Sequence, residues 1–437
     1  MKCCPAVCWW FAWGVLLTFG AVARAENWPQ WRGPTGDCIS RETNLPAELG
    51  PEKNLAWKLP LPGMSGATPI VWDDRIFLPS EDGDDLVLLC VSTAGKPLWK
   101  TRLATGKRRF MRDEGNQSSA SPSTDGKHVY VFFGTGDFAC CDFQGQVVWQ
   151  FNAQERYGPF NILHGMHVTP VLHGDRLYFS LLHSGGWWVI AIDKTTGKDV
   201  WKVERPTDGQ FEGQHSYASP VLWRRGDDAY LVVHGCDYTT AHRLSDGREI
   251  WRLTDLNLKA RYDRTLRFVA SPTASADLIV VPTAKHGPVV ALKPEAKGTI
   301  RAGSPFEQWR LPAGTADTPS KTPDVPCPLI HDGLVYLVRQ WQRETGALLC
   351  LDAKTGKEHY YGKLHAARYR SSPVYADGKI YLASRDGVIT VVKAGPKFEV
   401  LAINRLPDQI AATPVISNGR IYIRGFETLY AFSLEGK

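Results

Sequence analysis

Arginine side chains gather in a few polar segments of this 437-residue sequence. The guanidinium group carries a planar fork of N–H donors that matches the oxygens of a carboxylate or a phosphate. We expect these segments, with two neighbouring histidines, to bind an anionic group such as an acidic sugar or a peptide carboxylate. The candidate ligand-binding residues are Arg109, Arg112, His167, His215, Arg264, Arg267, Arg368 and Arg370.

Acidic residues lie in the same segments, so the arginines could instead be neutralised within solvated loops. The acidic residues concerned are Asp113, Glu114, Glu212 and Asp263. The sequence leaves both interpretations open.

Other side chains give weaker signals. The stretch HGMH at 164–167 could hold a metal ion, but two histidines in a loop without a carboxylate at motif spacing are more typical of structural contacts. Trp187, Trp188 and Trp341 could stack on a planar ligand or a sugar, although packing between strands is the commoner role. We therefore predict no metal site and no catalytic residue.

An internal repeat must position these side chains. A Ser/Thr-Pro pair followed by a short apolar run recurs eight times, at intervals of 41 to 56 residues. Only Cys327 replaces the Ser or Thr. The prolines are Pro69, Pro122, Pro170, Pro220, Pro272, Pro328, Pro373 and Pro414.

Each copy contains four short β-type runs separated by turns, several of them Asp-Gly or Asn-Gly hairpin turns. A four-stranded unit repeated at this period predicts an all-β, eight-bladed β-propeller. The last copy stops before its fourth run, and residues 54–63 contain a fourth run without the other three. We expect this N-terminal strand to close the ring in the last blade. The loops before each Ser/Thr-Pro pair then meet around the axis on one face.

A second motif ends each unit and reads, for example, AIDKTTGKDVW at 191–201 and RLSDGREIW at 243–251. It resembles the docking motif of the pyrroloquinoline-quinone (PQQ)-like, or quinoprotein-type, propellers. The opening segment NWPQWRGPTGDCISRETNLP (27–46) is similar to that of exported members from planctomycete-like bacteria. The resemblance implies that one Trp per blade holds neighbouring blades together. The corresponding residues are Trp57, Trp99, Trp149, Trp201, Trp251 and Trp309.

The resemblance implies two classes of function. Quinoprotein dehydrogenases of this family use PQQ with Ca²⁺, whereas other members, such as the scaffold that helps assemble outer-membrane proteins, bind no cofactor. Residues 54–437 provide about 48 residues per blade (384/8), which leaves little chain for a lid over a cofactor. We predict a non-catalytic binding or scaffold module without a cofactor. The alternative is a PQQ- and calcium-dependent dehydrogenase that oxidises an alcohol or a sugar.

The adjacent Cys140 and Cys141 bear on that choice, because some quinone enzymes form a disulfide between adjacent cysteines. Alignment of FACCDFQGQVVW (138–149) with 190–201 places the pair at Ala191 and Ile192. Consecutive residues of a strand point to opposite faces, so we expect two separate thiols.

Residues 1–25 have the features of a signal peptide: Lys2, an apolar run at 7–22 and the small-x-small end Ala23-Arg24-Ala25. We expect cleavage after Ala25, a lead-in segment at 26–53, the propeller at 54–437, and a periplasmic or secreted location.

Without Lys2 and Arg24 the chain has 49 basic and 45 acidic residues, a net charge of +4 that is too small to indicate nucleic acid. No later segment is long enough to span a membrane. The expected partners of this predicted monomer are an envelope or extracellular protein, or an anionic small molecule or saccharide.

Overall fold

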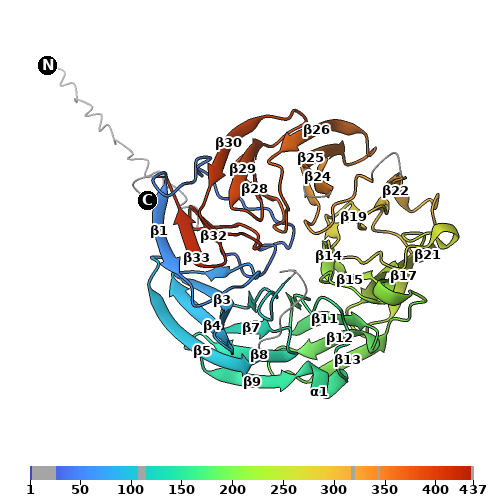
Figure 1. Cartoon of the computed structure of the whole chain (residues 1–437), viewed down its shortest axis with the longest axis horizontal. Coiled ribbons are helices and arrows are strands. Elements are labelled where there is room, and N and C mark those ends of the chain that lie inside the picture. Colours follow the sequence, from blue (N-terminus) through green and yellow to red (C-terminus); the bar gives the residue numbers. More distant parts are fainter. Residues whose placement is uncertain (2–25, 107–114, 316–319, 342–344, 435–437) are drawn as a thin grey trace.

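Eight β-sheets form a closed ring in this computed structural model (Figure 1). The structure describes residue 1 and residues 26–106, 115–315, 320–341 and 345–434; the predicted signal peptide lies outside the described residues. Each sheet runs from an inner strand beside the axis to an outer strand at the rim. The predicted eight-bladed, four-stranded all-β propeller is confirmed.

The first four blades follow the chain in order. Blade 1 contains β2 (Ile70–Trp72), β3 (Arg75–Asp82), β4 (Asp85–Ser92) and β5 (Pro97–Thr105). Blade 2 contains β6 (Ser123–Thr124), β7 (His128–Phe132), β8 (Asp137–Asp142) and β9 (Val147–Asn152). Blade 3 contains β10 (Val171–His173), β11 (Arg176–His183), β12 (Gly186–Asp193) and β13 (Asp199–Glu204). Blade 4 contains β14 (Val221–Arg225), β15 (Asp228–Gly235), β16 (Tyr238–Arg243) and β17 (Glu249–Leu253).

The other four blades complete the ring. Blade 5 contains β18 (Thr273–Ala274), β19 (Ile279–Val281), β20 (Val289–Leu292) and β22 (Glu307–Leu311). Blade 6 contains β23 (Leu329–His331), β24 (Leu334–Trp341), β25 (Thr345–Asp352) and β26 (Glu358–Leu364). Blade 7 contains β27 (Val374–Ala376), β28 (Lys379–Ala383), β29 (Val388–Lys393) and β30 (Val400–Arg405). Blade 8 contains β31 (Val415–Ser417), β32 (Arg420–Arg424), β33 (Thr428–Phe432) and β1 (Leu55–Pro60), which pairs antiparallel with β33.

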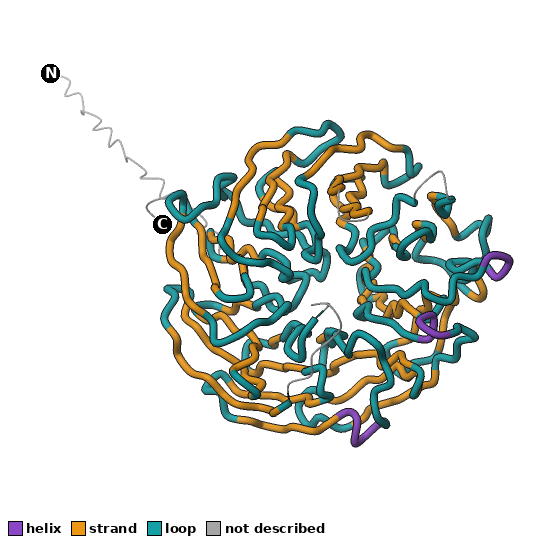
Figure 2. The backbone as a smooth tube through the Cα atoms, in the orientation of Figure 1, coloured by secondary structure: helices purple, strands orange, loops and turns teal. Residues whose placement is uncertain are grey.

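The remaining elements are short. A fifth strand, β21 (Gly298–Ile300), leaves blade 5 and pairs parallel with β17 at the rim of blade 4. The helical turns are α1 (Ala153–Tyr157), η2 (Phe211–Gln214) and η3 (Lys259–Arg261). Figure 2 shows that loops, not helices, approach the axis of the ring.

At five of the eight junctions, neighbouring blades dock through one Trp and one Gly. Trp149 of blade 2 donates its Nε1–H to the carbonyl oxygen of Lys194 in blade 3, at 2.9 Å. Gly197 of the same turn has a φ of +66°, and a Cβ at that position would lie 2.8 Å from the Trp149 ring. The motif therefore needs a glycine for two reasons: the left-handed backbone and the indole that covers it. Four more indole N–H groups donate to backbone carbonyls in the same way: Trp57 to Thr93, Trp99 to Phe143, Trp201 to Leu244 and Trp309 to Ala353.

Trp251 lies in a different environment. Strand β21 pairs beside it, with Gly298 opposite Trp251, and the indole is 1% exposed. Its Nε1 has no hydrogen-bond partner within the described part of the chain, and its ring meets Tyr230 edge-on at 6.2 Å. The fifth strand thus replaces the docking turn at this junction.

Cys140 and Cys141 are separate, buried thiols, as the alignment predicts. Cys140 pairs with Trp149 in the register, as Ala191 pairs with Trp201, and a bulge follows both positions. Cys140 packs between blades 2 and 3, whereas Cys141 packs between blades 1 and 2. The position opposite the Trp takes a small side chain, which explains why a cysteine is found there.

The Ser/Thr-Pro motif forms a ring of hydrogen bonds around the axis. At seven of the eight junctions, the backbone N–H of this residue in one blade donates to the side-chain oxygen of its counterpart in the next blade. These bonds measure 2.9 to 3.2 Å. They run from Thr68 to Ser121, Ser121 to Thr169, Thr169 to Ser219, Ser219 to Ser271, Cys327 to Ser372, Ser372 to Thr413 and Thr413 to Thr68. Cys327 provides no hydroxyl, and the junction before it is the one without this bond among the described residues.

Residues 26–53 cross the face that carries the turns between the two inner strands of each blade; we call them the floor segment. Trp28 exchanges backbone hydrogen bonds with Val71 of blade 1. Arg32, which is 4% exposed, donates from Nη1 to the carbonyl of Pro272 in blade 5 at 2.8 Å. The backbone carbonyl of Cys38 accepts the N–H of Tyr375 in blade 7. The floor segment therefore bridges distant blades and closes one end of the axial channel.

Candidate functional site

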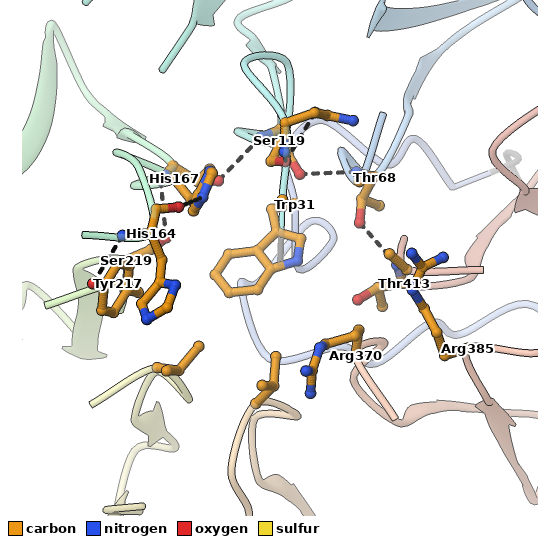
Figure 3. A pocket seen from close by; sticks show the side chains of 18 of the residues that line it. Trp31, Thr68, Ser119, His164, His167, Tyr217, Ser219, Arg370, Arg385 and Thr413 are labelled. Atoms are coloured by element: carbon orange, nitrogen blue, oxygen red, sulfur yellow. Dashed lines mark hydrogen bonds between the residues drawn. The ribbon is translucent and has the colours of Figure 1, made fainter. Parts of the chain in front are cut away.

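A pocket of about 1160 Å³, counting the solvent at its mouth, lies on the axis of the ring (Figure 3). Its lining comes from the entry segments of all eight blades, from the floor segment, and from the turns of blades 7 and 8 that hold Arg385 and Phe426. The residues that define it chemically are Trp31, Thr68, Ser121, His164, His167, Thr169, Tyr217, Ser219, Arg267, Asp324, Arg370, Arg385 and Thr413. The pocket opens on the face where the predicted loops meet.

Trp31 lies in the middle of the lining residues in Figure 3. It is half-buried, and its neighbour in the floor segment, Arg32, lies 5.8 Å from the ring centroid. The floor segment places it at the closed end of the channel because Trp28 and Arg32 on either side are buried and bonded to blades 1 and 5. Trp31 therefore forms an aromatic floor that faces the pocket.

The hydroxyl ring forms the lower wall above this floor. The hydroxyls of Thr68, Ser121, Thr169, Ser219 and Thr413 line the pocket. Each oxygen accepts a backbone N–H from the neighbouring blade, which leaves its own hydrogen as a donor. No acceptor for these hydrogens lies within the described residues, so the wall can donate hydrogen bonds to a bound molecule.

One side of the pocket carries the imidazoles and a phenol. His167 Nε2 lies 2.6 Å from the carbonyl oxygen of His164, and the His164 N–H donates to Tyr217 Oη at 3.3 Å. A Cβ at Gly115 would lie 2.6 Å from the His167 ring, so this glycine lets the loop close over the imidazole. Burial raises the pKa of Tyr217, which therefore stays a neutral phenol at physiological pH.

Three guanidinium groups also line the pocket. Arg267 Nη1 lies 3.3 Å from Glu212 Oε2, and Arg370 Nη1 lies 4.0 Å from Asp324 Oδ2. Arg385 lies over the ring of Phe426, with its Cζ 4.0 Å from the centroid. Figure 3 shows Arg370 and Arg385 across the pocket from His164, His167 and Tyr217.

The structure brings three of the eight sequence-predicted residues to this pocket: His167, Arg267 and Arg370. Arg109 and Arg112 lie outside the described residues. The other three do not line it. Arg264 is exposed and lies 4.9 Å from the ring centroid of Phe211, and His215 Nε2 lies 2.8 Å from Ser184 Oγ. The backbone carbonyl of Arg368 accepts the N–H of Arg385, so Arg368 holds the backbone of a lining residue without lining the pocket itself.

The sequence also allowed the arginines to be neutralised by acidic residues of the same loops. One such contact is present, between Glu212 and Arg267. Asp263 accepts from the hydroxyl and the N–H of Thr265. Asp113 and Glu114 lie outside the described residues.

Sequence reasoning missed Arg385, Asp324 and Trp31. Arg385 lies in the SRDG turn at 384–387, between β28 and β29, and such turns open on the same face as the entry loops. Its position in the repeat is the signal that could have identified it. Trp31 has no such signal, because the path of the floor segment is not periodic.

The tryptophans that the sequence suggested as platforms lie elsewhere. Trp187 donates to the carbonyl of Gln214 at 3.2 Å and lies outside the pocket. Trp188 packs in the apolar core of blades 2 and 3, and the side chain of Trp341 lies outside the described residues.

The donors of this pocket do not fit a calcium-bound quinone. Calcium takes about six to eight oxygen ligands, several of them carboxylates. Asp324 is the one carboxylate in the described lining, and Arg370 lies beside it. Nor do the described residues contain a cluster of three or more His, Cys, Asp and Glu side chains that could hold a metal ion. The side chains present suit an anion instead.

No helix in the described residues combines the length and apolar character needed to cross a membrane.

Solved structures with this fold include both functional classes considered for the sequence. BamB from Moraxella catarrhalis matches with a TM-score of 0.61 and 12% identity over 87% of this chain and 99% of that chain. A europium-containing methanol dehydrogenase matches with a TM-score of 0.68 and 12% identity over 94% and 98%. The quinohemoprotein alcohol dehydrogenase from Comamonas testosteroni matches with a TM-score of 0.67 and 14% identity over 94% and 81%. At these identities the matches show the fold alone.

Sequence comparisons reach further than the fold. The serine/threonine-protein kinase AfsK of Streptomyces griseus is 36% identical over 114 residues, which are 24% of this chain and 14% of the kinase, so the chain spans a small part of that relative. The family model described as outer membrane protein assembly factor BamB matches residues 83–294 and 296–395, well over half of the chain. The chain therefore belongs to the BamB family of PQQ-like propellers.

Proposed function

We propose that this chain is an exported, non-catalytic propeller that acts as a binding or scaffold module and holds an anionic group of its partner in the central pocket. One observation carries this proposal: Arg267, Arg370 and Arg385 converge on a single pocket whose described lining contains one carboxylate. Guanidinium groups that converge from different loops are suited to bind the oxygens of an anion.

The depth of the arginines supports the proposal. Glu212 contacts Arg267 and Asp324 lies beside Arg370, and Asp324 is the one carboxylate among the described lining residues. The side chains of Arg267 and Arg370 are 21% and 16% exposed. Salt screens charges at this depth less than charges on the open surface, so an incoming carboxylate would interact strongly with them.

The closed floor also supports binding. Trp31 and the floor segment end the channel, so the pocket can hold the end or a side group of a larger molecule rather than thread it. The proposed partner is an envelope or extracellular protein, or an acidic small molecule or saccharide. The location follows from the expected removal of residues 1–25.

Charge reversal tests the proposal directly. Binding of citrate, a compact tricarboxylate probe, is measured by isothermal titration calorimetry with the wild type, Arg267→Glu and Arg370→Glu. A hydrogen bond to a charged group contributes about 1.5 to 3 kcal/mol, so each reversal should weaken binding by about 10- to 100-fold. Arg264→Glu is the matched control, because Arg264 belongs to the same loop as Arg267 but lies over Phe211 outside the pocket.

Recovery of partners from envelope extracts extends the test. The wild type and Arg264→Glu should recover the same proteins, and Arg267→Glu and Arg370→Glu should lose them. If citrate binding and partner recovery survive both reversals, the pocket is not the site. Reduction of an artificial dye by an alcohol or a sugar, dependent on added PQQ and Ca²⁺, would contradict the non-catalytic assignment.

A further inference from the structure

Trp31 differs from the other tryptophans of the fold in its surroundings. Among the tryptophans whose side chains the structure describes, it is the one outside all of the apolar clusters that form the core. Trp28, three residues earlier, is 0% exposed and packs in such a cluster. Trp31 therefore has little packing role in the core, and its half-buried indole faces the pocket.

The indole N–H of Trp31 also differs from those that join the blades. Five docking residues, such as Trp149, donate this hydrogen to a carbonyl of the next blade. The described residues provide no acceptor for the Trp31 N–H. An aromatic face and a free N–H in one pocket are features of a surface that binds a ring, because the negative face of the indole attracts the positive C–H edge of a ring above it.

We infer that the pocket binds an acidic sugar, a pyranose ring that carries a carboxylate, with the ring stacked on Trp31 and the carboxylate directed to Arg370 and Arg385. This inference rests on the proposed function and adds the class of ligand. Figure 3 shows the arrangement: Trp31 lies in the middle, with the two arginines on one side.

The wall of the pocket favours a sugar over a flat aromatic anion. Thr68, Ser121, Thr169, Ser219 and Thr413 present hydroxyls around the floor, each with a hydrogen to donate. A hydroxyl can both donate to and accept from another hydroxyl, so this wall matches the hydroxyls at the edge of a pyranose. An aromatic anion would present carbon edges to most of the same positions and leave their hydrogens unused.

The enclosed space limits how much of a ligand can enter. It measures about 180 Å³, below the roughly 300 to 1,000 Å³ of typical ligand pockets, so it suits the end of a larger molecule. A short chain of acidic sugars could thus place its terminal ring on Trp31 and extend toward the open face, where Arg267 and Asn116 lie on the lining.

Titration calorimetry with four probes tests this class of ligand on the wild-type protein. The probes are trigalacturonate, the neutral sugar maltotriose, citrate, and pyridine-2,6-dicarboxylate as a flat aromatic anion. Trigalacturonate should bind at least about tenfold more tightly than each of the others. If citrate binds equally well, the pocket recognises charge without the ring, so the inference fails and the proposed function stands. Tighter binding of the aromatic dicarboxylate overturns the inference in favour of a planar ligand. If no anionic probe binds, both fail.

Variants at the floor give an independent readout. Trp31→Ala should weaken trigalacturonate about tenfold and leave citrate within about twofold, whereas Trp31→Phe should recover most of the loss because it keeps an aromatic face. Thermal unfolding of both variants reports whether the floor segment still folds. Equal trigalacturonate affinity in the wild type and in a folded Trp31→Ala protein would overturn the stacking role.

Discussion

The contact between Trp149 and Gly197 gives the sharpest test of how the blades hold together. Gly197 has a φ of +66° and lies under the Trp149 ring of the preceding blade, 2.8 Å from where a Cβ would be. Gly174, in the same blade, has a φ of +60°, but a Cβ there would meet nothing within 4 Å. The two glycines share the backbone conformation and differ in the indole.

The expected losses of stability follow from this difference. An alanine in the left-handed region costs roughly 1 to 2 kcal/mol, so Gly174→Ala should lower the free energy of unfolding by about that amount. Gly197→Ala has the same backbone cost and also forces a methyl group into the Trp149 ring. Overpacking of this kind adds typically about 1 to 3 kcal/mol, which gives a total of about 2 to 5 kcal/mol.

Urea unfolding of both variants, followed by tryptophan fluorescence, measures these values. A double-mutant cycle with Trp149→Leu isolates the contact: without the indole, Gly197→Ala should cost no more than Gly174→Ala. Equal losses for Gly174→Ala and Gly197→Ala in the presence of Trp149 would refute the docking account, because the indole would then exert no constraint on the turn.

Two further predictions concern the thiols and the response to acid. Burial raises the pKa of the Cys90 and Cys141 thiols to about 12, and all seven described cysteines are free and buried. A thiol reagent should therefore react with them only after denaturation, and a peptide containing a Cys140–Cys141 disulfide in mass spectrometry would contradict the strand register. Burial raises the pKa of Asp125, but a hydrogen bond from Lys194 of the next blade and backbone N–H donors outweigh it and hold the pKa at about 2 in the folded protein. Because that pKa lies below the ordinary 3.8, Asp125 stabilises the fold above pH 4 and the contribution disappears as the pH falls toward 2. Unfolding midpoints measured between pH 5 and pH 2 should fall less steeply for Asp125→Asn, and identical slopes would show that the Lys194 pair has no part in acid stability.

The repeats made the fold predictable because each motif has a local physical cause. A Ser or Thr before the proline carries the hydroxyl for the ring of hydrogen bonds, and a Gly in the last turn fits beneath the preceding indole. Cys327, the one departure from the first motif, marks the junction where the described ring lacks a bond. Periodicity also located the face of the loops, which is why the predicted residues include three that line the pocket: His167, Arg267 and Arg370.

The pocket was only partly predictable because its closed end depends on a long-range contact. Trp31 reaches the axis since Arg32 bonds to Pro272, 240 residues away, and no repeat predicts that path. Side-chain direction was equally hidden: Arg264 and Arg267 are three residues apart, yet one lies over Phe211 and the other lines the pocket. The direction of each side chain depends on the shape of its own loop, and the repeat pattern does not specify that shape.

Difference electron density from crystals grown with and without trigalacturonate shows directly whether the axial pocket binds an acidic sugar. We predict a ring over Trp31 with its carboxylate at hydrogen-bond distance from Arg370 or Arg385. Density for the sugar elsewhere on the molecule, with the axial pocket unchanged, would contradict this prediction.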